Sequence, residues 1–184
     1  MSALAEYVIR RAGADDLPLV LSLRKKLFLE MEIPPEALVP DAAVILKQRY
    51  ELEFRRDSLA HFIAWDAAGD PAACVGTLIK DDFPYLFFKP GCYGQIVDVF
   101  TEPPHRGKGL SRKLLQLALD WLRSKGIREA KLVASGSDAA RLYQSCGFRN
   151  TWDFFLPLDG GGTYNDYVNE REERRQNQRT HLKF

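Results

Sequence analysis

Apolar positions in the first part of the chain change from a spacing of two residues to a spacing of three or four. Residues 6–10 (EYVIR) alternate weakly, which favours a short strand, and residues 17–28 carry apolar side chains at helical spacing. The Pro34-Pro35 pair is expected to end this helix. Residues 41–57 then predict a second amphipathic helix. Its inward side chains are expected to be Val44, Ile45, Tyr50 and Leu52.

The middle of the chain has the pattern of a hairpin followed by a strand and a helix. Residues 60–67 and 72–80 are strand-like and are separated by the turn sequence AGDP. Prolines among the aromatic residues of 81–91 predict a loop. A third long strand is expected over 93–101 (YGQIVDVFT), and the broad apolar stripe of 110–126 predicts an amphipathic helix.

The last part of the chain predicts a strand, a helix and a strand before a polar tail. These are the segments EAKLVAS (129–135), SDAARLYQSCG (137–147) and FRNTWDFFLPL (148–158). The mixed order of strands and helices indicates the α/β class. We therefore expect a single domain over 1–158 and a polar, charged C-terminal tail over 159–184, beginning at the flexible sequence DGGG. Composition favours a solvated helix or a frayed tail, and an interaction arm is the alternative.

Composition limits the classes of protein to which the chain can belong. Its 184 residues fit one ordinary domain, and 46% hydrophobic residues are enough for a packed core. The formal net charge of +1 gives no overall field that would attract nucleic acid or an acidic membrane. No stretch approaches the roughly 18 uncharged apolar residues of a membrane span. We therefore expect a soluble, cytoplasmic protein without a nucleic-acid or membrane partner.

Cysteines and histidines offer no recognisable metal site or disulfide framework. The three cysteines lie far apart without CxxC spacing, which suits a reducing compartment, and the three histidines lack metal-ligand spacing. No metal is expected. These residues are Cys74, Cys92, Cys146, His61, His105 and His181.

The segment VDVFTEPPHRGKGLSRKLL joins a strand to a helix through an Arg-Gly-Lys-Gly turn. Glycines let backbone amides approach a ligand, and free amides at a helix N-terminus favour an anion. Residues 106–128 include seven Lys or Arg residues and a single acidic residue, Asp120, so this part of the sequence is locally basic. A plain strand-helix turn with a solvated helix face is the alternative. A Walker loop would need Gly at Glu102, and a dinucleotide fingerprint would need a third Gly at Arg112, so both patterns fail.

Two motifs resemble those of the GNAT acetyltransferase family, and on them the chain is identified as a member. The turn is similar to the family pattern (Arg or Gln)-x-x-Gly-x-(Gly or Ala) at Arg106 and Gly109, with Ser111 at the last small position. SDAARLYQSCGF is similar to the family segment Asn-x-x-Ala-x-x-(Leu)-Tyr-x-x-x-Gly-Phe, with Ser137 in place of Asn. The matching positions there are Ala140, Leu142, Tyr143, Gly147 and Phe148.

The resemblance implies a GNAT fold, with a mixed central sheet that is splayed at the cofactor site and flanked by helices. It implies acetyl-CoA as the acyl donor, with the pantetheine arm along the third long strand and the pyrophosphate in the turn. It also implies that Tyr143 is the general acid, whereas its alternative role is that of an ordinary core tyrosine. The implied cofactor-binding residues are Val97, Val99, His105, Arg106, Gly107, Lys108, Gly109, Leu110, Ser111, Arg112, Ser137 and Ala140.

The general base that several family members carry has no counterpart here. The start of the third long strand, residues 92–95, reads Cys-Tyr-Gly-Gln and contains no carboxylate. Period-two alternation places Val97 and Val99 on one face with Tyr93 and Gln95, and Asp98 on the other, which makes Asp98 structural unless a bulge turns it. A water relay is expected, or an acid from elsewhere such as Glu30 or Glu32. A covalent route through Cys92 or Cys146 is disfavoured, because neither has a neighbouring histidine in the sequence.

The acceptor pocket is expected between the link that joins the first two helices and the loop before the third long strand. The link contributes three acids and the loop four aromatic residues, so we expect a small-molecule primary amine on an apolar or aromatic scaffold. Acetylation of a protein amine, or acyl-CoA sensing without catalysis, are the alternatives. The resemblance also suggests a homodimer. The acids and aromatic residues are Glu30, Glu32, Glu36, Phe83, Tyr85, Phe87 and Phe88, and Tyr93 and Gln95 are further substrate-binding candidates.

Overall fold

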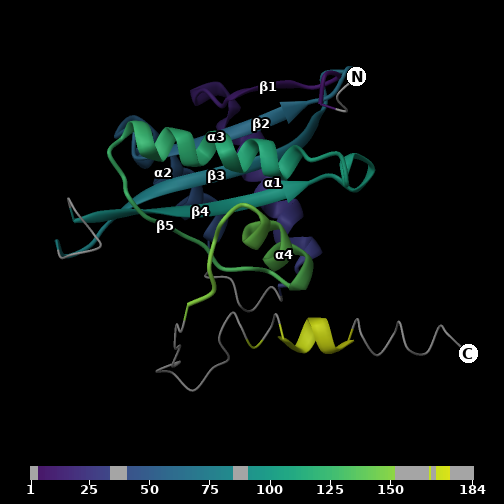
Figure 1. Cartoon of the computed structure of the whole chain (residues 1–184). Coiled ribbons are helices and arrows are strands. Elements are labelled where there is room, and N and C mark those ends of the chain that lie inside the picture. The colour runs from purple at the N-terminus through teal and green to yellow at the C-terminus, as the bar shows by residue number, and fades with distance from the viewer. Residues whose placement is uncertain (1–3, 34–40, 85–90, 152–165, 167–168, 175–184) are drawn as a thin grey trace, which may run out of the picture.

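A five-stranded mixed sheet forms the centre of the protein, whose structure is a computed structural model (Figure 1). The structure describes residues 4–33, 41–84, 91–151, 166 and 169–174. The sheet order is β1 to β5; the first four strands pair antiparallel, and β5 pairs parallel to β4. None of the helices in the described parts is long and apolar enough to cross a bilayer. The strands are β1 (Val8–Arg11), β2 (Leu59–Trp65), β3 (Pro71–Asp81), β4 (Cys92–Thr101) and β5 (Ala130–Lys131).

The helices cover both faces of the sheet, as expected for the α/β class. Val75, Ile96 and Leu114 belong to a buried core between the sheet and α3. Val20, Ile63 and Phe100 belong to a second core between the sheet and α1 with α2. In Figure 1, α3 crosses the near face and α1 and α2 lie behind the sheet. The helices are α1 (Leu17–Glu30), α2 (Ala42–Arg55), α3 (Leu110–Ser124) and α4 (Ser137–Ser145), with short 3-10 turns at η1 (Ala14–Asp16) and η3 (Pro103–His105).

The buried face of α2 differs from the predicted one. Tyr50 is buried as expected, but Val44 and Ile45 are 55% and 50% exposed. At 100° per residue, these two positions lie roughly 120–140° around the helix from Tyr50. Tyr50 is fixed inward because its hydroxyl donates a 2.5 Å hydrogen bond to Asp98, and this contact sets the orientation of the helix.

The sheet opens between β4 and β5. The predicted strand 129–135 pairs only at Ala130 with Gly94 and at Lys131 with Gln95, whereas β4 continues to Thr101. The edge of β4 from residue 96 onward therefore has no β5 residue paired with it. This divergence is the splay that the family resemblance implied.

Most of the last predicted strand, 148–158, lies outside the described residues, as do most of the tail, Glu36 and the aromatic residues Tyr85, Phe87 and Phe88. Within the tail, the described residues 169–174 are helical, and Arg171 is buried against the domain. This part of the tail is therefore not solvated throughout. The division at 158 and 159 stays a prediction.

Candidate active site

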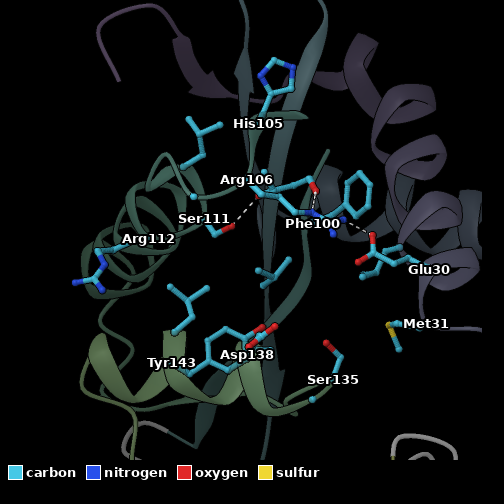
Figure 2. Close-up of a pocket in the computed structure, with 18 of the residues that line it drawn as sticks. Glu30, Met31, Phe100, His105, Arg106, Ser111, Arg112, Ser135, Asp138 and Tyr143 are labelled. Carbon is cyan, nitrogen blue, oxygen red and sulfur yellow. Dashed lines mark hydrogen bonds and ion pairs between the residues drawn. The ribbon is translucent and has the colours of Figure 1, made fainter. Parts of the chain in front are cut away.

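A cleft of about 520 Å³ lies where β4 and β5 separate. Its walls come from the second half of β4, the turn before α3, the end of α1, the β5–α4 loop and α4 (Figure 2). The tail also contributes two residues. The lining residues are Leu27, Glu30, Met31, Val99, Phe100, Thr101, His105, Arg106, Gly107, Gly109, Leu110, Ser111, Arg112, Ser135, Gly136, Asp138, Ala139, Leu142, Tyr143, Arg171 and Glu172.

The turn before α3 has a conformation that glycine favours at two positions. Gly107 has φ 76° and Gly109 has φ 84°, and α3 begins directly afterwards at Leu110. The first N–H groups of a helix have no partner within the helix. Here they face a cleft, and together with the helix dipole they can bind an anion such as a phosphate.

Ser111 replaces the small motif residue without disturbing the turn. Its hydroxyl lies 2.7 Å from that of Thr101, the last residue of β4. The serine therefore joins the end of the strand to the start of α3. A glycine or alanine at this position could not make this contact.

The longer side chains of the turn make contacts elsewhere in the protein. His105 Nδ1 lies 2.8 Å from the Tyr7 hydroxyl, and the Lys108 amine donates to the same hydroxyl over 2.9 Å. Hydrogen bonding to Tyr7 and then to Glu6 raises the pKa of Lys108. Lys108 is not among the described residues that line the cleft. The cradle therefore consists mainly of backbone, with Arg112 as a lining cation.

A bulge in β4 changes which side chains face the cleft. Val97 pairs with Gly76 and Phe100 with Cys74, so that Asp98 and Val99 together oppose one residue of β3. Asp98 has φ 54°, which reverses the alternation. The expectation that Val97 and Val99 share a face is therefore wrong. Val99 lines the cleft and packs against the α3-side core, whereas Val97 is not among the described lining residues.

Asp98 is turned by the bulge into a buried cluster on the α1–α2 side of the sheet. Its carboxylate accepts hydrogen bonds from Arg24, from Tyr50 at 2.5 Å and from His61, whose Nε2 is 2.9 Å away. Burial alone would raise the pKa of Asp98, but the His61 hydrogen bond and the Arg24 charge outweigh it and lower the pKa to about 2. Burial and the Asp98 charge raise the pKa of Tyr50. With its oxygens engaged by three residues, Asp98 is structural.

Tyr143 reaches the cleft from α4, as Figure 2 shows. It is 6% exposed and contacts Phe148 edge to face, with ring centroids 6.1 Å apart. Two other α4 residues lie differently from what the motif implied. Ser137 and Ala140 are not among the described residues lining the cleft, whereas their neighbours Asp138 and Ala139 are. Ala140 instead lines an adjacent hollow of about 820 Å³.

The predicted acceptor residues are only partly brought together. Glu30 lines the cleft, but its carboxylate is 2.5 Å from the Arg106 guanidinium. Four further candidates, Glu32, Phe83, Tyr93 and Gln95, are not among the described lining residues. Phe83 is 85% exposed, and the Tyr93 ring centroid lies 4.5 Å from the Lys131 amine. Tyr85 lies outside the described residues.

Several lining residues were missed by sequence reasoning. Leu27 and Met31 come from the end of α1, and Ser135 and Gly136 from the β5–α4 loop. The one local signal was Gly136, whose lack of a side chain indicates a close approach. Arg171 had none, because it lies in a uniformly charged tail. No group of three side chains suited to holding a metal ion occurs within the described residues.

Comparisons with known proteins give a consistent picture. The chain matches the model of the acetyltransferase (GNAT) family over residues 25–148. A mycothiol acetyltransferase of Acidothermus cellulolyticus is 35% identical over 74 residues, which are 39% of this chain and 22% of that protein.

Solved structures resemble most of the chain. A predicted acetyltransferase from Clostridium acetobutylicum, solved with acetyl-CoA, is 26% identical with a TM-score of 0.74, covering 83% of this chain and 95% of that one. An aminoglycoside N-acetyltransferase solved with CoA is 23% identical with a TM-score of 0.63, covering 82% and 93%. At that identity the second likeness shows the fold alone.

Proposed function

Because the chain belongs to the acetyltransferase (GNAT) family, we propose that it transfers the acetyl group of acetyl-CoA directly to a primary amine of a small molecule. The match to the family model confirms the family that the two motifs indicated, and the solved structures confirm the α/β fold. Acetyl-CoA is the acyl donor of the family. The observation that carries the proposal is the cleft itself. The backbone amides of the turn before α3 lie at one end of the cleft, and Tyr143 lies in its wall. The part of β4 that is not paired with β5 runs along its side.

The proposed reaction has three steps, and the protein takes part directly in the first and the last. The turn from Gly107 to Arg112 holds the pyrophosphate of the donor by its amides. The neutral amine then attacks the thioester carbon and forms the amide bond, and the carbon–sulfur bond breaks. Tyr143 donates its phenolic proton to the departing thiolate, and the proton released by the amine passes to water. A phenol is a suitable donor when it contacts the sulfur in a dry site, and Tyr143 is buried.

The cleft has the size of a small-molecule pocket, about 520 Å³, and in the proposed reaction it also holds the donor. Support for a small-molecule acceptor comes from proteins that share the fold. Solved structures that share the fold include proteins named for small acceptors, an aminoglycoside and glucosamine 6-phosphate. A protein acceptor would need an open groove, and a sensor would bind acetyl-CoA without transfer. The expected homodimer stays a prediction.

A thiol-release assay with a panel of amines tests the proposal. Wild-type protein should release CoA only when an amine is present, and small amines should be better acceptors than lysine-containing peptides. Calorimetric binding of acetyl-CoA without amine-dependent release would instead indicate a sensor module. Preference for peptides over every small amine would indicate protein acetylation.

A further inference from the structure

Arg171 places a buried positive charge in the wall of the cleft. The residue is 4% exposed, although it lies in the charged tail. Its Nη2 donates to the Ser135 carbonyl oxygen, and the Glu172 carboxylate is 3.9 Å from the same atom. Its Nε is buried and has no hydrogen-bond partner among the described residues. A guanidinium has five N–H donors, and a buried charge is costly unless it is paired. The described residues therefore compensate the charge of Arg171 only in part.

Contacts with the start of α4 and with the residues just beyond α1 hold Arg171 in this place. Glu172 accepts a 3.3 Å hydrogen bond from the Ser137 hydroxyl at the start of α4. Arg174 lies 3.4 Å from the Glu32 carboxylate just beyond α1. Gly136 lets the tail approach, since a Cβ there would lie 2.7 Å from Glu172 Oε1 and 3.4 Å from Arg171 Nη2. The helical turn of the tail thus contacts both the start of α4 and the segment just beyond α1.

We propose that Arg171 binds an anionic group, a carboxylate or a phosphate, carried by the amine acceptor. The proposal rests on the proposed function and narrows its substrate class to amines that also bear an oxyanion. Arg171 lies beside Ser135, and Figure 2 shows Ser135 on the Met31 side of the cleft, with Tyr143 between it and Arg112. The turn at Arg112 already offers a phosphate site for the donor. Arg171 is therefore left for the acceptor, and its planar guanidinium, which lines the cleft, is a donor suited to an oxyanion.

Matched amine pairs that differ by one anionic group test the proposal. Phenylalanine with phenethylamine, and glucosamine 6-phosphate with glucosamine, are compared as acceptors of wild-type protein and of Arg171→Gln. In at least one pair, the substitution should lower kcat/KM of the anionic member at least tenfold more than that of its partner. Arg171→Lys should restore part of the difference. Arg123→Gln, at an exposed ion pair of α3, is the matched control and should leave both members unchanged. Equal effects on the two members of both pairs overturn the proposal.

A second arm separates the two sources of the anion. Calorimetry compares acetyl-CoA with its 3'-dephospho form on wild-type protein and Arg171→Gln. Equal small effects on both forms support the acceptor assignment. A tenfold loss for acetyl-CoA, absent for the dephospho form, would place the donor phosphate on Arg171 and overturn it.

A binding measurement keeps this inference separate from the proposed function. N-acetylphenylalanine and N-acetylphenethylamine are titrated into CoA-loaded protein, which requires no turnover. Selective binding of the anionic compound that Arg171→Gln abolishes supports the anion site even if no amine is acetylated. Turnover with any amine, without such selectivity in binding or in kcat/KM, sustains the proposed function and overturns this inference. If Arg171→Gln does not fold, Arg171→Met takes its place, because it keeps an unbranched side chain of similar length but removes the charge.

Discussion

The Arg106 guanidinium lies 2.5 Å from the Glu30 carboxylate and joins the phosphate turn to the last residue of α1. Its Nε also donates to the Thr101 carbonyl oxygen over 2.9 Å. The motif arginine therefore fixes the position of the turn through its side chain, and the backbone amides are left for a ligand. Substitutions in this turn should consequently affect donor binding through the backbone more than through Arg106.

Gly109→Val should weaken acetyl-CoA binding at least tenfold, or about 1.4 kcal/mol. No protein atom lies within 4 Å of a Cβ placed at residue 109, so the protein itself has room for a side chain. The loss arises because φ is 84° and because the donor phosphate must approach the backbone at this point. Calorimetry on the folded variant measures it.

Gly126→Val separates backbone strain from ligand approach. Gly126 also has positive φ, 76°, with no atom within 4 Å of its Cβ position, but it lies beyond the far end of α3. The Gly126→Val variant should lose about as much stability as Gly109→Val while keeping its affinity for acetyl-CoA. Arg106→Ala should weaken binding less than Gly109→Val. Unchanged affinity in folded Gly109→Val would remove the donor site from this turn.

Tyr143→Phe should lower kcat by roughly ten- to ten-thousandfold, the range for loss of a positioned acid. The fold and the affinity for acetyl-CoA should persist, because the ring keeps its contact with Phe148 and only the hydroxyl is removed. Steady-state kinetics with one acceptor, together with calorimetry of donor binding, measure both quantities. Wild-type turnover in this variant would make Tyr143 a packing residue.

Acid should destabilise the protein through Asp98. Its pKa is lowered to about 2 in the folded state, against about 3.9 in an unfolded chain. The stabilisation is therefore present above about pH 4 and is lost as pH falls toward about 2, and it amounts to roughly 2–3 kcal/mol. Denaturant unfolding at several pH values should show this loss in wild-type protein.

Asp98→Asn should lose stability at neutral pH and show a smaller decrease on acidification. Arg24, whose side chain is 23% exposed, would keep its partly buried charge without a carboxylate partner, which is the costly half of a broken pair. Asp57→Asn is the control. Its pKa is also lowered, by hydrogen bonds from Lys125 and then Arg11, but its side chain is 49% exposed. Its effect should stay within about 1 kcal/mol. Equal effects of the two substitutions would contradict the structural role of Asp98.

Local sequence signals predicted the elements better than the contacts between them. The start of α3 follows from the glycine turn and from the apolar stripe that includes Leu110 and Leu114, both of which are local. The orientation of α2 and the bulge at Asp98 are not local. They depend on contacts among Tyr50, His61 and Asp98, which come from three different elements. Alternation along β4 alone could not predict them.

Lining residues of the cleft that belong to short motifs could be predicted, whereas those brought together from distant segments could not. Gly107, Gly109 and Tyr143 were identified from short motifs and do line it. Glu30 was expected to bind the substrate or to act as the base, but its charge is paired with Arg106. Arg171 comes from a segment whose composition resembles a solvated tail. Its burial depends on the Ser135 carbonyl and on Gly136, which no pattern within the tail reveals.

The last prediction concerns acceptor preference. Glu30 and Glu32 would attract cations, but Arg106 and Arg174 offset their charges, and Arg171 adds a buried positive charge. Multiply charged cations such as spermidine and aminoglycosides should therefore be poor acceptors. Apolar lining at Leu27, Met31, Phe100 and Leu142 should favour an aryl-alkyl scaffold.

The pH dependence of this preference follows from the chemistry of the amine. Only the neutral amine attacks, so kcat/KM for an aryl-alkyl acceptor should rise with pH until the acceptor, or the group that relays its proton, is deprotonated. The pKa of each amine sets the fraction that is neutral at a given pH, and this fraction can hide a preference of the pocket. The acceptor amines are therefore compared over a range of pH at a fixed concentration of acetyl-CoA. A higher plateau of kcat/KM for spermidine than for aryl-alkyl amines would contradict the apolar pocket and leave acetyl transfer itself standing.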